Sequence, residues 1–217
     1  MKLLSTILIF CLLAGCNSAE DEVFNEDDLY EPFFSSDYYV YNFSEYPIDF
    51  YMMNLRNSTS ADAIYKQHNY QQSVDAYNGF TKLSFKRSTL GNVGFAAFYD
   101  DEIKVQRQKW IANDTENYLI VYEANSQLKL GFLARTNAID ITGDPMVRLV
   151  SFAGDMNYTY KRGTSLLLEE IATSYLPITD CGTDLQIIGY EYDFCSLESR
   201  GYLVLVLPNQ SLAIIEE

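Results

Sequence analysis

Carboxylates are the most abundant side chains in this sequence that could carry out chemistry. Two acidic segments, Asp100–Glu102 and Asn113–Glu116, each follow a stretch with the composition of a strand. Paired carboxylates can cleave glycosidic bonds, and their oxygens are also ligands of calcium. Neither segment has the spacing of an EF-hand loop, and acids are ordinary residues of hairpin turns. We therefore interpret both segments as turns and predict no catalytic, cofactor-binding or metal-binding residues.

The single histidine, His68, is the other candidate for catalysis, and it lies in a polar stretch that we expect to be a long loop. A general base needs an orienting carboxylate and a nucleophile within hydrogen-bond reach, and the neighbouring sequence offers neither. The sequence also has no GxSxG, HExxH, P-loop or GxGxxG motif. These observations predict a protein that is not an enzyme and that uses no cofactor.

The first sixteen residues predict export. Met1 and Lys2 form a short basic region, and the apolar segment Leu3–Gly15 is shorter than the roughly 20 residues that span a bilayer. The segment Leu13–Cys16 resembles the lipobox of bacterial lipoproteins. This resemblance implies cleavage after Gly15 and acylation of Cys16 on its sulfur and its new amino group, so that the protein binds the membrane through lipidated, palmitate-bearing Cys16. An ordinary secretory signal is the alternative.

The residues after Cys16 bear on localisation and charge. Gram-negative lipoproteins with Asp directly after the lipidated cysteine are retained at the inner membrane, and Asn17 at this place predicts the outer membrane of the cell envelope. Between Asn17 and Ser36 the chain has seven acids and no base, which predicts an extended, solvated tether. The whole chain has 15 basic and 30 acidic residues, a net charge of −15, which disfavours nucleic acid as a partner.

Two cysteines remain once Cys11 is removed with the signal and Cys16 is modified. In an oxidising compartment, Cys181 and Cys195 are expected to form a disulfide. Closing a loop of this size stabilises a chain by roughly 3 kcal/mol in the chain-entropy model. There is no CxxC spacing, which disfavours a redox-active pair.

The 18 tyrosines are the feature that points to recognition, because exposed tyrosine favours contacts with glycans or proteins. They crowd the first half of residues 38–136, at Tyr38, Tyr39, Tyr41, Tyr46, Tyr51, Tyr65, Tyr70 and Tyr77. Alternatively, half of them fill a core and the rest lie on outward strand positions. The main hypothesis is a non-enzymatic, membrane-anchored envelope lipoprotein with a binding, adhesion or structural role. The alternative is a carbohydrate-binding or carbohydrate-active domain that uses exposed tyrosines and acidic loop residues.

Short runs rich in Tyr, Phe, Val and Ile recur between polar breaks, which predicts an all-β fold. The one exception is residues 164–175, whose pattern fits a helix as well as a strand. The predicted strands are Tyr38–Ser44, Ile48–Asn54, Phe80–Lys86, Val93–Tyr99, Ile103–Trp110, Asn117–Glu123, Leu128–Ala134, Val147–Phe152, Asn157–Lys161, Leu185–Tyr192, Tyr202–Leu207 and Ser211–Ile215.

An internal repeat organises these strands. Residues 117–128 match residues 201–212 at an offset of 84, and residues 39–44 match residues 148–153 at an offset of 109. The matches predict two tandem antiparallel, Ig-like β-sandwich modules, the second shorter. The predicted organisation is a signal peptide (1–15), a tether (16–37), repeat 1 (38–136), a linker (137–146) and repeat 2 (147–217).

The strand patterns Tyr39–Tyr51 and Arg148–Tyr160, with the late strands Tyr118–Tyr122 and Tyr202–Val206, resemble a family of bacterial extracytoplasmic β-sandwich repeats catalogued as a domain of unknown function. The resemblance covers nearly all of residues 38–217. It implies a sandwich fold in a secreted or lipid-anchored protein, and it offers no catalytic residues to transfer.

Overall fold

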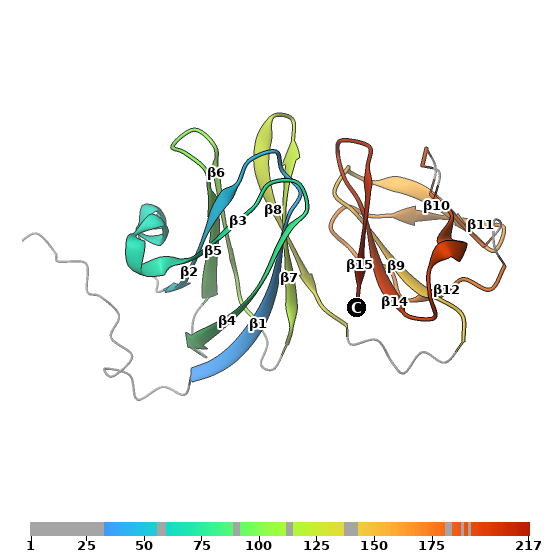
Figure 1. Cartoon of the computed structure of the whole chain (residues 1–217), viewed down its shortest axis with the longest axis horizontal. Coiled ribbons are helices and arrows are strands. Elements are labelled where there is room, and N and C mark those ends of the chain that lie inside the picture. The colour runs from blue at the N-terminus through green and yellow to red at the C-terminus, as the bar shows by residue number, and fades with distance from the viewer. Residues whose placement is uncertain are drawn as a thin grey trace, which may run out of the picture. The chain divides into compact units, whose positions relative to one another are not determined.

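Fifteen β-strands and three short 3₁₀-helices form the part of the chain that the structure describes, which is residues 33–55, 60–88, 92–111, 115–136, 143–180, 184–187, 189–190 and 192–217 (Figure 1). This computed structural model has no α-helix within those residues. The elements are β1 (Phe33–Asn42), β2 (Ile48–Leu55), η2 (Ala61–Tyr65), η3 (Gln67–Asn69), β3 (Tyr70–Val74), β4 (Gly79–Ser88), β5 (Asn92–Phe98), β6 (Lys104–Lys109), β7 (Asn117–Ala124), β8 (Gln127–Ala134), β9 (Met146–Ser151), β10 (Met156–Tyr160), β11 (Gly163–Leu167), β12 (Leu176–Pro177), β13 (Leu185–Ile187), η4 (Phe194–Ser196), β14 (Gly201–Val206) and β15 (Leu212–Glu216).

The first sandwich is built from two four-stranded sheets, in the orders β4-β1-β7-β8 and β3-β2-β5-β6. Alternation along β1 explains how it forms, since Tyr38 and Val40 are fully buried while Tyr39 and Tyr41 on the opposite face are only partly buried. Successive side chains of a strand point to opposite faces, so one face of β1 enters the core. That core joins β1 to Phe50, Phe95 and other apolar residues of the second sheet.

The second sandwich is smaller, with sheets in the orders β12-β9-β14-β15 and β11-β10-β13. Its core combines Val147 and Leu149 of β9 and Val204 of β14 with Leu185 and Ile187 of β13. The prediction of an all-β chain with two sandwiches, the second shorter, is confirmed. The sheets are not purely antiparallel, however, because β1 pairs with β7 and β9 pairs with β14 in parallel.

The two sandwiches share one topology, as the repeat predicts. Asn42 lies opposite Val121 in the first parallel pair, and Ser151 lies opposite Val206 in the second. Just beyond these pairs, the Phe43 amide donates to the Val121 carbonyl, and the Phe152 amide donates to the Val206 carbonyl, both at 2.8 Å. The equivalence gives an offset of 109 between β1 and β9, as predicted.

The predicted offset of 84 for the later strands is wrong by one residue. Because Val121 and Val206 occupy equivalent positions, the offset between β7 and β14 is 85. A slip of one residue moves every side chain to the other face of a strand. At the correct offset the outward Tyr118 matches the outward Leu203, whereas the predicted match pairs Tyr118 with Tyr202, which faces the core.

The outer faces of β7 and β14 are buried against each other, and this explains why both strands are apolar throughout. Residues Phe33–Glu217 form one compact unit. A shared cluster joins Tyr118, Ile120, Tyr122 and Leu133 of the first sandwich to Val150, Phe152, Leu203, Leu205, Leu207 and Ile215 of the second. Equivalent positions from both halves thus meet, as in the self-complementary interface of a two-fold dimer.

Several boundaries differ from the prediction. β1 begins at Phe33, opposite Ser88 of the long strand β4, so residues 33–37 belong to a strand rather than to the tether. Most of β11 lies within residues 164–175, and after it the chain turns at Glu170, whose φ is 56° and whose amide donates to the Ser151 carbonyl at 2.8 Å. β13 ends at Ile187 because the Tyr190 amide turns back to the Ile187 carbonyl, with Gly189 at a φ of 88°.

The signal peptide, Cys16, the tether through residue 32, and linker residues 137–142 lie outside the described residues. Cys181 also lies outside them. Cys195 belongs to η4, but its side chain is not among those described. Lipidation of Cys16 and the disulfide therefore stay predictions.

Candidate functional site

The acidic segment Asp100–Glu102 forms the turn between β5 and β6. The Asp100 carboxylate accepts the amides of Glu102 at 2.9 Å and Ile103 at 2.8 Å, and Asp101 lies 3.5 Å from the Lys104 ammonium. Side chains of this kind often close turns by hydrogen bonding to nearby amides. This segment thus has the turn role that we expected.

The second acidic segment is described only from Thr115 onward. Its Glu116 carboxylate forms an ion pair with Arg135 and accepts the Tyr39 hydroxyl at 3.2 Å. His68 is exposed in η3, so the expected long loop contains short helices. Within the described residues no group of three or more His, Cys, Asp or Glu side chains is arranged to hold a metal ion.

The crowded tyrosines separate into different environments. Tyr38 lies in the first core, and Tyr51 packs with Tyr65 and Tyr70 in a small cluster on the outer face of β2. Burial raises the pKa of Tyr65 to about 12, so its phenol stays neutral. Tyr77 is 69% exposed in the turn before β4. Most of these rings therefore fill cores. Tyr77 is exposed in a turn, whereas Tyr39 and Tyr41 lie close to other rings on the outer face of β1 and are the candidates for a shared recognition surface.

Four rings on the outer face of β1 and β4 form a surface that we call the aromatic strip: Tyr39, Tyr41, Phe43 and Phe80. Phe80 lies opposite Tyr41 in the β1–β4 register, and their ring centroids are 4.7 Å apart. The rings of Tyr41 and Phe43 are almost parallel, at 3° and 6.0 Å. Phe80 is 52% exposed, so the strip continues the apolar outer face of this sheet to a place where solvent reaches it.

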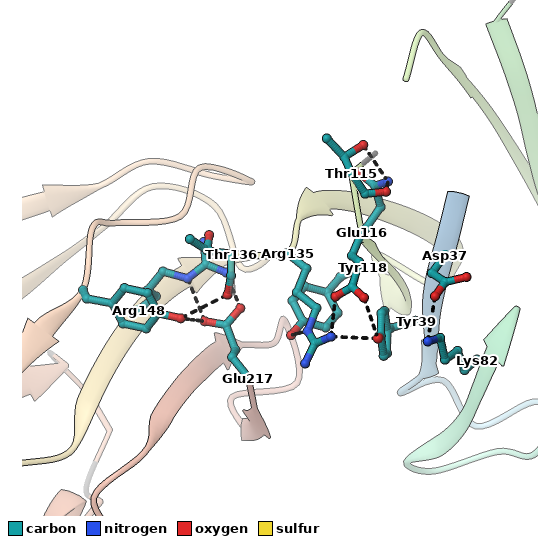
Figure 2. Close-up of polar contacts among 12 residues, drawn as sticks. Asp37, Tyr39, Lys82, Thr115, Glu116, Tyr118, Arg135, Thr136, Arg148 and Glu217 are labelled. Carbon is teal, nitrogen blue, oxygen red and sulfur yellow. Dashed lines mark hydrogen bonds and ion pairs between the residues drawn. The ribbon is translucent and has the colours of Figure 1, made fainter. Parts of the chain in front are cut away.

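A polar edge of charged side chains surrounds Tyr39, at one end of the aromatic strip (Figure 2). Lys82, opposite Tyr39, lies 5.1 Å from the centre of that ring and 2.7 Å from the Asp37 carboxylate. On the other side, Arg135 donates to the Tyr39 hydroxyl at 2.7 Å and to the Tyr118 hydroxyl at 3.1 Å. These contacts fix the Tyr39 ring and place hydrogen-bonding groups beside an apolar surface.

Asp37 and Lys82 in this edge stabilise each other's charged forms. The hydrogen bonds from Lys82 and Ser84 hold the pKa of the Asp37 carboxyl below its usual range, and Asp37 in turn raises the pKa of Lys82. Burial raises the pKa of the Tyr41 phenol. At neutral pH the strip is therefore an uncharged aromatic surface with an ion pair at its margin.

A second polar network lies where the chain passes from the first sandwich to the second. Arg148 donates to the Glu217 carboxylate at 2.8 Å through Nε, and the Tyr175 hydroxyl donates to the same carboxylate at 2.9 Å (Figure 2). The Tyr175 hydroxyl also lies 3.3 Å from the carbonyl oxygen of Thr136. These side chains are engaged with one another, so their role is to hold the structure.

Sequence reasoning identified only part of this candidate site. Tyr39 and Tyr41 were singled out as tyrosines, whereas Phe43, Phe80, Lys82 and Arg135 were missed. The alternation of aromatic residues 39, 41 and 43 is a signal that could have identified Phe43. Phe80 and Lys82 reach the strip only through the β1–β4 register, which the sequence does not specify.

No protein-family model matches the chain, and no curated protein matches it. Among the residues that the structure describes, none of the helices has the length and apolar character needed to cross a bilayer.

Proposed function

We propose that this protein is a non-enzymatic lipoprotein of the bacterial envelope that recognises a partner through the aromatic strip. The observation that carries the proposal is the exposure of Phe80 beside Tyr41, on a sheet face whose other half is buried against the second sandwich. Aromatic side chains with few rotatable bonds supply contact area at low entropic cost, and they are enriched among the residues that dominate binding energy.

Carboxylates of both acidic segments are already hydrogen-bonded or ion-paired within the protein, which supports a binding role rather than catalysis. Asp100 closes a turn, and Glu116 is paired with Arg135. A turnover of glycan or peptide libraries that an acid-to-amide change abolishes would contradict this part of the proposal.

The binding role is tested with the mature chain carrying Cys16→Ser, added to isolated cell envelopes and measured by co-sedimentation. The double variant Tyr41→Ala/Phe80→Ala should weaken binding by at least about tenfold, the loss expected for central aromatic contacts. Trp110→Ala is the matched control, because Trp110 is 61% exposed and lies outside the strip. Equal binding by the double variant and the control would overturn the role of the strip.

The membrane anchor is tested separately. The lipobox Leu13–Cys16 predicts that Cys16→Ser leaves the protein unlipidated and uncleaved by the lipoprotein signal peptidase. We expect mass spectrometry to find the wild-type chain acylated on Cys16 and beginning at that residue, and the variant unacylated and still carrying residues 1–15. A wild-type chain without acyl groups by mass spectrometry would contradict the anchor.

A glycan is the second candidate ligand, and the geometry of the strip is what favours it. The Tyr39 ring lies beside Lys82 of the Asp37–Lys82 pair, so the aromatic strip has hydrogen-bonding groups at its margin. A glycan array incubated with micromolar protein tests this candidate. Binding that is lost in Tyr41→Ala/Phe80→Ala would establish it, and an array without binding would remove it.

A further inference from the structure

β11 lies at one edge of the sheet β11-β10-β13 and corresponds to β3 of the first sandwich. In the first sandwich the long strand β4 lies beside β3, and the Thr81 hydroxyl of β4 donates to the Gln72 side chain of β3 at 2.9 Å. The counterpart of β4 is β12, which has only two residues. Four of the five residues of β11, Gly163 to Leu166, are exposed, so solvent reaches this strand.

Two residues of β11 direct their backbone groups away from β10. A two-residue turn with positive φ at residues 161–162 joins the strands, and in such a hairpin the flanking Tyr160 and Gly163 are hydrogen-bonded to each other. Bonded and non-bonded positions alternate in an antiparallel pair. Thr164 and Leu166 therefore direct their amides and carbonyls toward the free edge.

Contacts on the other side of β10 agree with this orientation. The Lys161 amide donates to the Asp184 carbonyl at 2.9 Å, next to β13, so the neighbouring Tyr160 faces β11. Residues 143–180, which contain β10, β11 and the chain after them, are all described. Within the described chain no other segment forms a backbone hydrogen bond with Thr164 or Leu166. The edge thus offers two amides and two carbonyls to a further strand.

β11 lacks features that commonly prevent edge strands from pairing. Its sequence, GTSLL, has no charged residue and no proline, and its register with β10 has no bulge. The outward Leu166 is 57% exposed, and Leu168 and Ile171 just beyond the strand are 42% and 56% exposed. A strand added at this edge would cover apolar surface as well as satisfy backbone groups.

Opposite charges flank the two ends of β11. Lys161 and Arg162 are exposed before its first residue, and Asp155 and Glu169 are exposed beside its last. Five strand residues separate these ends by about 14 Å, which exceeds the screening length of about 8 Å at physiological ionic strength. In an antiparallel pair of two β11 strands, the basic end of each would lie beside the acidic end of the other. β11 is therefore complementary to itself in charge.

We propose that β11 pairs with β11 of a second copy of this chain, antiparallel and about a two-fold axis. Thr164 of each copy bonds to Leu166 of the other, and the two copies of Ser165 lie opposite each other on the axis. This register engages both outward residues of each copy, whereas pairing either residue with itself leaves the other without a partner within β11. The interface is self-complementary, as a two-fold axis requires, and it joins two three-stranded sheets into one.

Sedimentation equilibrium of the mature chain carrying Cys16→Ser tests for the dimer, which should form in a concentration-dependent way. Leu166→Lys brings like charges close to each other across the axis and should raise the dissociation constant at least about tenfold. Trp110→Lys is the matched control, because Trp110 is 61% exposed and lies in the first sandwich. This control should leave the dimer unchanged.

Cross-linking tests the register. In a non-bonded antiparallel pair the Cα atoms lie about 4.5 Å apart, which a disulfide can bridge. Ser165→Cys should therefore form a covalent dimer on mild oxidation. Thr164→Cys, also exposed and one residue away, is the control, because the two copies of Thr164 would lie diagonally, about 8 Å apart and beyond the reach of a disulfide.

Charge reversal tests the antiparallel orientation. Lys161→Glu and Glu169→Lys each bring like charges together at both ends of the dimer, so each variant alone should associate more weakly. In an equimolar mixture the contacts between the ends again join opposite charges. The mixture should therefore sediment as a heterodimer at concentrations where each variant alone is a monomer.

Three results would overturn the proposal: a monomer at every concentration, cross-linking of Ser165→Cys no faster than that of Thr164→Cys, or a mixture of charge variants that associates no better than each alone. A dimer that Phe80→Lys abolishes and Leu166→Lys retains would also overturn it, because self-association would then occur through the aromatic strip.

Discussion

The two sandwiches use the same positions for different chemistry. Tyr39 of the first sandwich and Arg148 of the second occupy equivalent positions. Arg135 and Glu217 are also equivalent, because the Arg135 amide donates to the Glu116 carbonyl and the Glu217 amide donates to the equivalent Gly201 carbonyl, each at 2.9 Å. In the first sandwich the pair is a phenol beside a guanidinium, at a partly open surface. In the second it is an ion pair whose side chains are 7% and 0% exposed.

The difference follows from what lies beside the first strand of each sandwich. The ten residues of β4 pair with β1 along its whole length and leave Phe80 exposed on the outer face. In the second sandwich, β12 has only two residues, and Glu170 and Thr173 donate their amides to β9 instead. The same strand topology thus carries a partly exposed aromatic surface in the first sandwich and a buried ion pair in the second.

The largest effect on stability is expected from Arg148→Met. The change leaves the buried Glu217 carboxylate without its cation, which costs about 3–5 kcal/mol when one member of a buried pair is removed. Tyr39→Phe, at the equivalent position, removes one partly exposed hydroxyl and should cost about 0.5–1.5 kcal/mol. Urea unfolding of the two variants measures both free energies.

The double variant Arg148→Met/Glu217→Met is the control for this comparison, since it removes both charges from the site. It should recover most of the lost free energy of unfolding. If Arg148→Met proves no more costly than Tyr39→Phe, the two equivalent pairs do not differ in the way that their burial indicates.

A smaller effect is expected where the sandwiches meet. A Cβ atom placed on Gly131 would lie 2.2 Å from the ring of Phe152, so Gly131→Ala should destabilise the protein by about 1–3 kcal/mol. Ala213, at the equivalent position, already carries a Cβ, and Ala213→Gly should cost about 0.5–1 kcal/mol through backbone entropy.

Thermal unfolding with a matched rescue checks this prediction. Phe152→Leu removes part of the ring that Gly131→Ala meets, so the double variant should be more stable than the sum of the two single changes implies. Strict additivity of the two changes would show that the close approach of Gly131 to Phe152 does not limit the contact.

The sequence predicted the strands that are rich in Tyr, Phe, Val and Ile, and it missed those that lack this composition. β3 (Tyr70–Val74) contains two glutamines and a serine, and β12 has only two residues, so neither carries a periodic signal. The repeat was found by residue identity, which matched Tyr118 with Tyr202. Which face a side chain occupies depends on its register, and the register places Leu203 opposite Arg148 as Tyr118 lies opposite Tyr39.

The candidate site was predictable to a similar degree. The turn role of Asp100 follows from its residue type, and the tyrosines of β1 are visible as an alternating pattern. The pairing of Phe80 with Tyr41 and of Lys82 with Tyr39 depends on contacts between residues about forty positions apart. Such contacts are set by how two strands pair in three dimensions, and no local pattern encodes them.

The smallest expected effect is the pH dependence that Asp37 gives to the first sandwich. Met146 occupies the equivalent position in the second sandwich and does not titrate. Hydrogen bonds from Lys82 and Ser84 lower the folded-state pKa of Asp37 below its ordinary value of 3.8. A carboxyl with a lowered pKa stabilises the fold fully above its unfolded pKa and loses this contribution as the pH falls through its folded pKa.

Asp37→Asn should therefore lower the Tm slightly at pH 7, and the difference from the wild type should shrink as the pH falls below about 4. Asp101→Asn is the control, because the Asp101 carboxylate is 95% exposed and lies 3.5 Å from its lysine. Its offset from the wild type should stay nearly constant over the same range, since an exposed pair of this kind contributes little. Matching pH profiles for the two variants would mean that the Asp37–Lys82 contact does not hold the edge of the aromatic strip in solution.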